Sequence, residues 1–147
     1  RYEVSGPAWL DREWSSQPLA ADQTGWDWFS LHLDSGERLM LFRVRENHRA
    51  PYITGTWINL DGSTQSLGRE QIQMTALEEA QVEGRRLPIA WQLKIPDKKL
   101  DISTRALNPQ SWMKLSIPYW EGPIRFQGSH TGRGYLEMTG YAQRLVL

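Results

Sequence analysis

Short segments in which apolar and polar residues alternate run through most of the chain, and they constrain its fold most strongly. Residues 26–33 (WDWFSLHL) alternate, residues 34–36 (DSG) turn the chain, and residues 38–44 (RLMLFRV) return, a pattern typical of a β-hairpin. Further segments of this kind are residues 52–60, 71–74, 87–95, 100–107, 120–127 and 134–141. Turn dipeptides separate several of them. The sequence therefore predicts about eight or nine short strands.

Helix signals are almost missing. Met74 to Glu83 (MTALEEAQVE) has a helix-forming composition that Gly84 ends, so we expect at most one short helix there, with a polar loop as the alternative. Successive strands are joined by hairpin-type turns with few long crossovers, which favours an up-and-down antiparallel barrel over a sandwich. The predicted fold class is all-β. A barrel of about eight strands either fills its interior with side chains or holds one small ligand.

Length and charge exclude several classes of protein. The 147 residues suit a single domain, residues 1–147. Lys plus Arg number 17 and Asp plus Glu number 17, so the net charge is zero, and the chain lacks the basic cluster of a nucleic-acid binder or a polybasic membrane surface. No window approaches the roughly 18 apolar residues of a membrane span. Because the chain begins with Arg1 rather than Met, we expect a piece of a longer precursor.

The sequence offers little for metal, nucleophilic or cofactor chemistry. It has no cysteine, and its histidines lack zinc-binding spacing; they are His32, His48 and His130. No Ser lies in a G-x-S-x-G elbow, and the glycines of residues 128–134 do not open a helix that could bind phosphate. We therefore expect neither a metal nor a cofactor.

Tryptophan is the compositional outlier, with eight residues. Several of them adjoin carboxylates, a combination that in a cavity would give apolar walls with polar anchors. The candidate ligand-binding residues are Trp14, Trp26, Trp28, Trp120 and Tyr141. The alternative is that the tryptophans fill the barrel and their N–H groups bond neighbouring strands. On residues 26–33, Asp27 interrupts an otherwise apolar face, while Trp26 and Trp28 lie on the opposite face.

Four segments together resemble the carotenoid 1,2-hydratase (hydroxyneurosporene synthase) superfamily, and more closely its AttH-type branch, often labelled predicted secreted hydrolases. These segments are residues 8–16 (AWLDREWSS), 25–45 (GWDWFSLHLDSGERLMLFRVR), 119–122 (YWEG) and 132–141 (GRGYLEMTGY). The resemblance implies a lipocalin-like (calycin) barrel and a chain with two such barrels, of which this one is similar to the C-terminal. It also implies export to the periplasm or cell envelope and an association with ABC-transporter systems.

The characterised members of the superfamily that this chain resembles add water to an isoprenoid double bond without a cofactor. Such hydration needs an acid that protonates carbon, an aromatic face beside the cation and a base for water. A carboxyl buried among aromatic rings would have a raised pKa, as the acid requires. The candidate acids are Glu121, Glu137 and, behind them, Glu13. Structural ion pairs with Arg12, Arg125 or Arg133 are the alternative role for these carboxylates.

Three functions therefore remain open from the sequence. The first is a barrel that binds a hydrophobic small molecule or serves as a structural partner of a sister N-terminal barrel. The second is a cofactor-free hydratase or isomerase acting on an isoprenoid-like substrate, and the third, for which a nucleophile is missing, is a hydrolase. An isolated domain should expose an apolar patch and form a homodimer. We also expect residues 8–16 and 134–141, near the two ends of the chain, to lie close together in a closed sheet.

Overall fold

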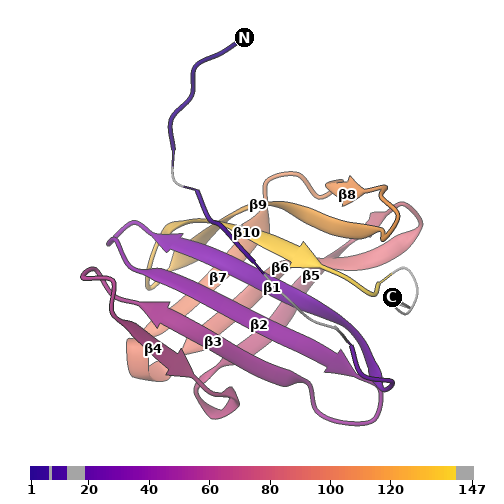
Figure 1. Ribbon diagram of the computed structural model, residues 1–147, viewed down its shortest axis with the longest axis horizontal. Coiled ribbons are helices and arrows are strands. Elements are labelled where there is room, and N and C mark those ends of the chain that lie inside the picture. The colour runs from indigo at the N-terminus through magenta and orange to yellow at the C-terminus, as the bar shows by residue number, and fades with distance from the viewer. Residues whose placement is uncertain (7, 13–18, 142–147) are drawn as a thin grey trace.

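The structure, a computed structural model, describes residues 1–6, 8–12 and 19–141 and consists of one curled antiparallel sheet (Figure 1). Its strands and two short 3₁₀ helices are β1 (Gln23–Leu33), β2 (Arg38–Glu46), β3 (Tyr52–Ile58), β4 (Thr64–Leu67), η1 (Arg69–Gln71), β5 (Gln73–Val82), β6 (Arg85–Ile95), η2 (Pro96–Lys98), β7 (Leu100–Ala106), β8 (Trp112–Met113), β9 (Tyr119–Gly128) and β10 (Gly132–Met138). The all-β, antiparallel, lipocalin-like barrel expected from the sequence is confirmed.

Neighbouring strands in the sheet follow one another in the chain almost everywhere. The order is β4-β3-β2-β1-β10-β9-β7-β6-β5, and the two-residue β8 pairs with β9. One exception is the pair of β7 and β9, between which the short β8 lies in the chain. The other is the central pair, in which β1 and β10 meet, with Trp28 opposite Glu137 and Leu33 opposite Gly132. The first and last strands therefore adjoin, while β4 and β5 form the two ends of the strand order.

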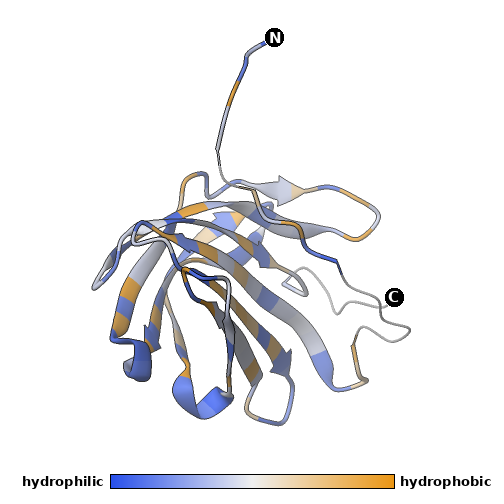
Figure 2. Ribbon diagram, turned by 60° about the vertical axis from the view of Figure 1, so that its left-hand side comes forward, coloured by the Kyte–Doolittle hydropathy of each residue, from blue (hydrophilic) through white to orange (hydrophobic). Residues whose placement is uncertain are grey.

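The alternation in the sequence becomes an alternation of inner and outer faces. Along β7, Leu100, Ile102, Thr104 and Ala106 are buried and the three residues between them are exposed. Figure 2 shows the same pattern as apolar and polar colours that alternate along the strands. Because side chains point to opposite faces with a period of two, each strand supplies one row to the interior and one row to the outer face.

The chain's own large side chains fill the interior. Trp91 and Trp120 are fully buried, and Phe29 of β1 meets Trp91 of β6 edge-on, with ring centroids 5.7 Å apart. Arg43 of β2 also reaches the Trp91 ring, at 5.3 Å. Both indole N–H groups are satisfied, since they donate to the carbonyl oxygens of Pro88 and Pro109, at 2.9 and 2.8 Å. Contacts that span the barrel in this way identify its interior as a packed core.

The two short helices connect the sheet's ends at one side of the barrel. The Gln71 side chain of η1 donates to an Asp97 carboxylate oxygen of η2 at 3.1 Å. Lys98 of η2 lies 5.0 Å from the Trp57 ring of β3. These contacts link β3 to the β6–β7 region across the place where β4 and β5 end the order.

The structure corrects three expectations about local elements. Met74 to Glu83 is not a helix, because residues 73–82 form β5 and pair with β6 along their length; tertiary pairing overrides the helix propensity of this segment. Residues 71–74 are not a separate strand, since β4 comes earlier and residue 71 ends η1. Residues 8–12 form no strand, and residues 13–16 lie outside the described residues.

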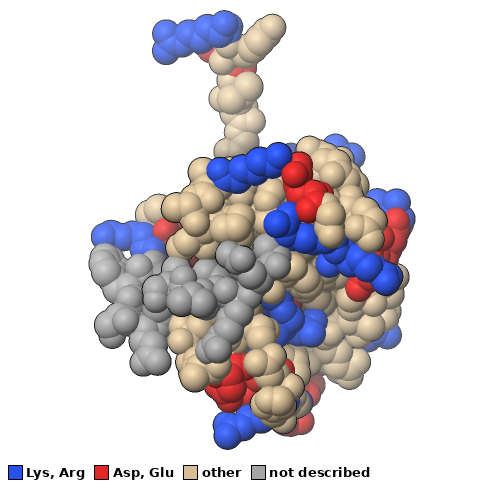
Figure 3. All heavy atoms as spheres, turned by 90° about the vertical axis from the view of Figure 1, so that its right-hand side faces the viewer, with Lys and Arg blue, Asp and Glu red and all other residues tan. Residues whose placement is uncertain are grey.

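Two properties of the described residues bear on the class of protein. No helix in these ranges has the length and hydropathy needed to cross a membrane. Acidic and basic side chains lie side by side over the face that Figure 3 presents, in keeping with the net charge of zero.

Candidate functional site

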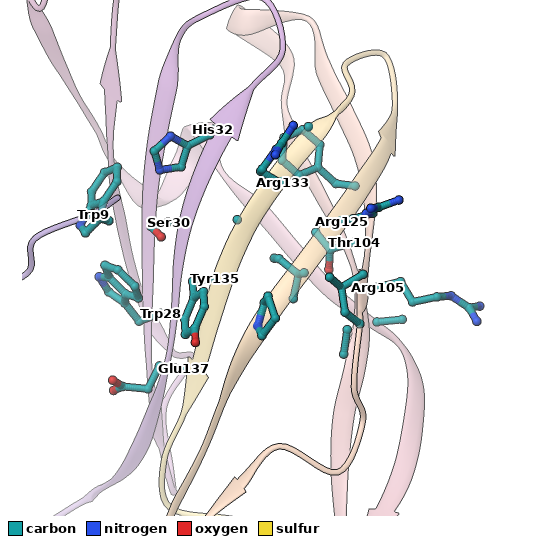
Figure 4. Close-up of a pocket in the computed structure, with 18 of the residues that line it drawn as sticks. Trp9, Trp28, Ser30, His32, Thr104, Arg105, Arg125, Arg133, Tyr135 and Glu137 are labelled. Atoms are coloured by element: carbon teal, nitrogen blue, oxygen red, sulfur yellow. The ribbon is translucent and has the colours of Figure 1, made fainter. Parts of the chain in front are cut away.

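A groove of about 1520 Å³ lies on the outer face of the sheet, over β1, β10, β9 and β7. Residues 8–11 of the N-terminal segment form one wall, and Figure 4 shows Trp9 facing Trp28 and His32 of β1. The Trp9 ring meets the other two rings edge-on, at 6.1 Å from Trp28 and 5.9 Å from His32. The N-terminal segment therefore approaches the central strands through aromatic contacts instead of strand pairing.

The strand register arranges the groove in transverse rows. Trp28 lies opposite Glu137, and Glu137 lies opposite Glu121, so an aromatic ring and two carboxylates form one row across three strands. The next row holds Ser30 and Tyr135. Direct neighbours in adjacent strands have side chains on the same face. Two of the predicted acids, Glu121 and Glu137, are thus adjacent on the groove side of the sheet.

Aromatic hydrogen-bond donors flank this pair of carboxylates. The Trp26 indole N–H donates to Glu137 Oε1 at 2.6 Å. Burial raises the pKa of the Tyr119 phenol, and the negative charge of Glu121 and a hydrogen bond to it raise that pKa further. No Lys or Arg among the described residues lies within ion-pair distance of Glu121, so the arginine pairing considered for it is not observed. Both carboxylates are half-buried.

A second cluster of polar residues lies on the inner face. Asp27 is fully buried, and its Oδ1 accepts hydrogen bonds from Arg45 at 2.7 Å and from the Tyr141 hydroxyl at 2.9 Å. Arg43 lies 3.8 Å from Oδ2, and the Arg45 guanidinium stacks 4.0 Å from the Tyr141 ring. Arg45 also donates to the backbone oxygen of Thr139. The cluster joins β1, β2 and the segment after β10.

Burial dominates the electrostatics of this inner cluster. It raises the pKa of Asp27, although the charges of Arg45 and Arg43 and the hydrogen bond from Tyr141 oppose the shift. Burial and the neighbouring Asp27 charge also raise the pKa of Tyr141, so its hydroxyl stays protonated as a donor. Sequence reasoning did not choose Asp27 as a site residue. The available signal was its inward position on the face that also carries Phe29 and Leu31.

The predicted site residues are distributed over both faces of the sheet. Trp28, Glu121 and Glu137 line the outer groove, and Trp26 adjoins it through Glu137. Trp120 is fully buried in the core, and Tyr141 belongs to the inner cluster. Glu13 and Trp14 lie outside the described residues. In the ranges that are described, no group of three or more His, Cys, Asp or Glu side chains could hold a metal ion.

Comparison with known proteins identifies the family. The family model described as AttH-like matches residues 1–141. The chain belongs to the AttH-like family. Among solved structures it is similar to a protein of Nitrosomonas europaea described as an AttH, with a TM-score of 0.78 and 26% identity over 87% of this chain. It is also similar to kievitone hydratase from Nectria haematococca, with a TM-score of 0.73 and 20% identity over 90% of this chain, a likeness of fold.

These matches cover only part of each solved structure. The chain spans 42% of the Nitrosomonas protein and 43% of kievitone hydratase. A search among curated proteins gives no match.

Proposed function

We propose that this AttH-like domain binds an apolar small molecule in its outer groove, as one barrel of a two-barrel protein. The observation that carries the proposal is the contrast between the two faces. The interior is packed with Phe29, Trp91 and Trp120, while the outer face carries an open groove walled by Trp9 and Trp28. Ligand sites in proteins are concave and mostly apolar, with a few polar groups that fix orientation.

The proposed sister barrel would cover this groove. Its support is that the chain spans less than half of each similar solved structure. Further support comes from exposed apolar residues at the groove's margin, where Leu77 and Leu107 are more than half exposed. In the absence of the sister barrel, the same surface would pair with a second copy of this chain. Because of the AttH resemblance, the proposal also includes export and a link to an ABC-transporter system. Fractionation of the producing cells tests the export.

The alternative is a cofactor-free hydratase or isomerase, and the paired carboxylates of the groove favour it. Glu121 and Glu137 are direct neighbours beside Trp28 and Tyr135. One carboxyl would protonate a double bond of an isoprenoid-like substrate, an aromatic face would stabilise the cation, and the second carboxylate would take a proton from water. Replacing both glutamates by glutamine would then abolish turnover but leave substrate binding intact, whereas a binding protein would show no turnover to lose.

Native mass spectrometry of the protein at its full natural length tests the binding function. We expect a retained apolar molecule that the variant Trp28→Ala releases, because Trp28 forms a groove wall. Trp112→Ala is the matched control, since Trp112 is half-buried against Arg85 and outside the groove. A ligand that survives W28A, or one lost equally in both variants, would refute binding in this groove.

A further inference from the structure

The outer face carries a transverse row of cationic and titratable side chains that the function proposed above does not use. Arg105 of β7 pairs in register with Arg125 of β9, which pairs with Arg133 of β10. Arg133 pairs with His32 of β1, and His32 pairs with Arg38 of β2. Five adjacent strands thus place basic or imidazole side chains side by side on one face, and we call these residues the basic row. Figure 4 shows its Arg105, Arg125, Arg133 and His32 beside the groove.

Most of the positive charge in the basic row is not balanced by the described residues. Arg105 forms an ion pair with Glu78 at 3.1 Å, and Arg38 donates to backbone oxygens. Neither Arg125 nor Arg133 has a carboxylate within ion-pair distance in the described ranges. Like charges directly opposite each other on paired strands are destabilising. An anion bound to Arg125 and Arg133, which are both exposed, would relieve this repulsion.

The pKa of His32 is affected by the same excess of positive charge. Burial lowers the pKa of its imidazole, and the positive charges of Arg38 and Arg133 lower it further. Its Nδ1 is buried without a hydrogen-bond partner among the described residues. Both effects favour the neutral imidazole, which lies between Arg38 and Arg133 in the strand register, at the end of the groove where the Trp9 ring meets it edge-on.

The rows beyond the basic row change from basic to uncharged and then to acidic. Two residues along β10 from Arg133 comes Tyr135, and two residues further comes Glu137, in the row with Trp28 and Glu121. At about 3.3 Å per residue, the basic and acidic rows are roughly 13 Å apart. The row between them holds Tyr135 with Ser30 and Pro123, and Trp9 lies alongside, in contact with the rings of Trp28 and His32. The groove therefore has one positive end, an uncharged middle that includes the Tyr135 ring, and one negative end.

We propose that the groove binds an amphipathic anion, whose carboxylate or phosphate head group lies on Arg125 and Arg133 and whose apolar body lies along Tyr135, Trp28 and Trp9. This inference rests on the proposed binding function and names its ligand class. Guanidinium groups bind carboxylates and phosphates through paired, charge-assisted hydrogen bonds, so two adjacent arginines suit such a head group. Glu121 and Glu137 repel an anion from the far end of the groove and so fix one orientation of the ligand.

Titration of tryptophan fluorescence with single-chain amphiphiles tests this inference on the protein at its full natural length. The probes are dodecanoate and dodecyl phosphate, each below its critical micelle concentration. Their controls are dodecanol, dodecyltrimethylammonium and inorganic phosphate. We expect at least one of the two anionic amphiphiles to bind about tenfold or more tightly than dodecanol, as expected for charge-assisted hydrogen bonds. The stronger of the two identifies the head group as a carboxylate or a phosphate.

Paired variants locate the head group. R125Q/R133Q should remove the preference for anionic amphiphiles, and dodecanol binding should stay unchanged. R49Q/R69Q is the matched control, because it makes the same change in net charge at two exposed arginines outside the groove. Since R125Q/R133Q relieves repulsion between neighbours, its melting temperature should not fall, and this measurement excludes a folding defect.

Each contrary result has a distinct meaning. If dodecanol binds as tightly as both anions, or if the two double variants behave alike, the anionic ligand class is wrong and the apolar groove of the proposed function still stands. Equal affinities for inorganic phosphate and dodecyl phosphate would also overturn the proposal of an amphipathic ligand, because the apolar body would then contribute nothing to binding. If no amphiphile binds, both the inference and the proposed function fail.

Discussion

Replacing Arg45 by methionine tests the role of the buried cluster on the inner face. Arg45 provides the closest ion pair to Asp27, at 2.7 Å, and the Asp27 side chain is 0% exposed. The variant leaves a buried carboxylate with only the Tyr141 hydroxyl and the more distant Arg43. Removing one partner of a buried ion pair costs about 3–5 kcal/mol of unfolding free energy. We expect about 3 kcal/mol, the lower end of this range, because two partners of Asp27 remain.

The pH dependence of this loss separates an electrostatic cost from a packing cost. The folded-state pKa of Asp27 is raised above its ordinary value of 3.8, so the folded chain takes up a proton at a higher pH than the unfolded chain does. The unfolding free energy therefore falls as the pH rises from about 3.8 through the folded-state pKa. Without Arg45 that pKa rises further and the range of loss extends upward. R45M should consequently cost more at pH 7 than at pH 4.

Urea unfolding followed by tryptophan fluorescence at the two pH values measures both effects. The double variant D27N/R45M should regain part of the lost stability, because it removes the buried charge along with its partner. R49M, at an exposed arginine, is the control for the general effect of the substitution. The reasoning is refuted if R45M costs less than about 1 kcal/mol, or if its cost is the same at pH 7 and pH 4.

Three further predictions concern the unfolding free energy of the domain. E121Q should raise the unfolding free energy by about 0.2–1 kcal/mol, since it removes a like charge directly opposite Glu137; a lower melting temperature would contradict this. G134A should lower it by about 1–3 kcal/mol, because a β-carbon at Gly134 would collide with a carbonyl oxygen of β1. G68A, where a β-carbon meets nothing within 4 Å, is the control, and equal urea midpoints for the two would refute the clash. Trp91→Ala should lower the unfolding free energy by about 3–5 kcal/mol, and a loss under about 1 kcal/mol would mean that the interior is not packed around it.

The sequence predicted the strands and the barrel because alternation and turn dipeptides are local signals. Residues 26–33 and 38–44 became the hairpin of β1 and β2, and successive strands became neighbours. The prediction of a helix at Met74 to Glu83 was wrong for the opposite reason. The helix-forming residues of this segment lie on an edge strand, and pairing with β6 sets its conformation. Propensity is a weak guide where a neighbouring strand supplies the hydrogen bonds.

The candidate site was predictable only in part, because the sequence of one strand does not show which residues of a neighbouring strand lie opposite it. Glu121 and Glu137 could be chosen as candidates from their aromatic neighbours, and the structure adds that they lie directly opposite each other. Trp120 looked similar in the sequence, yet it points into the core. The basic row could not be found from the sequence, since Arg105, Arg125 and Arg133 are spread over three strands and become neighbours only through pairing.

The pairing of β1 with β10 has a consequence for the order in which the barrel can assemble. The hydrogen bonds from Trp26 to Thr139 and to Glu137 join residues 113 and 111 positions apart in the chain. On the ribosome, β1 to β4 and β5 to β7 can form hairpins early, because their contacts are local. The two halves of the sheet can be joined in the middle only when the last described strand has been synthesised. Until then β1 has an exposed edge, which makes a nascent or truncated chain prone to aggregate.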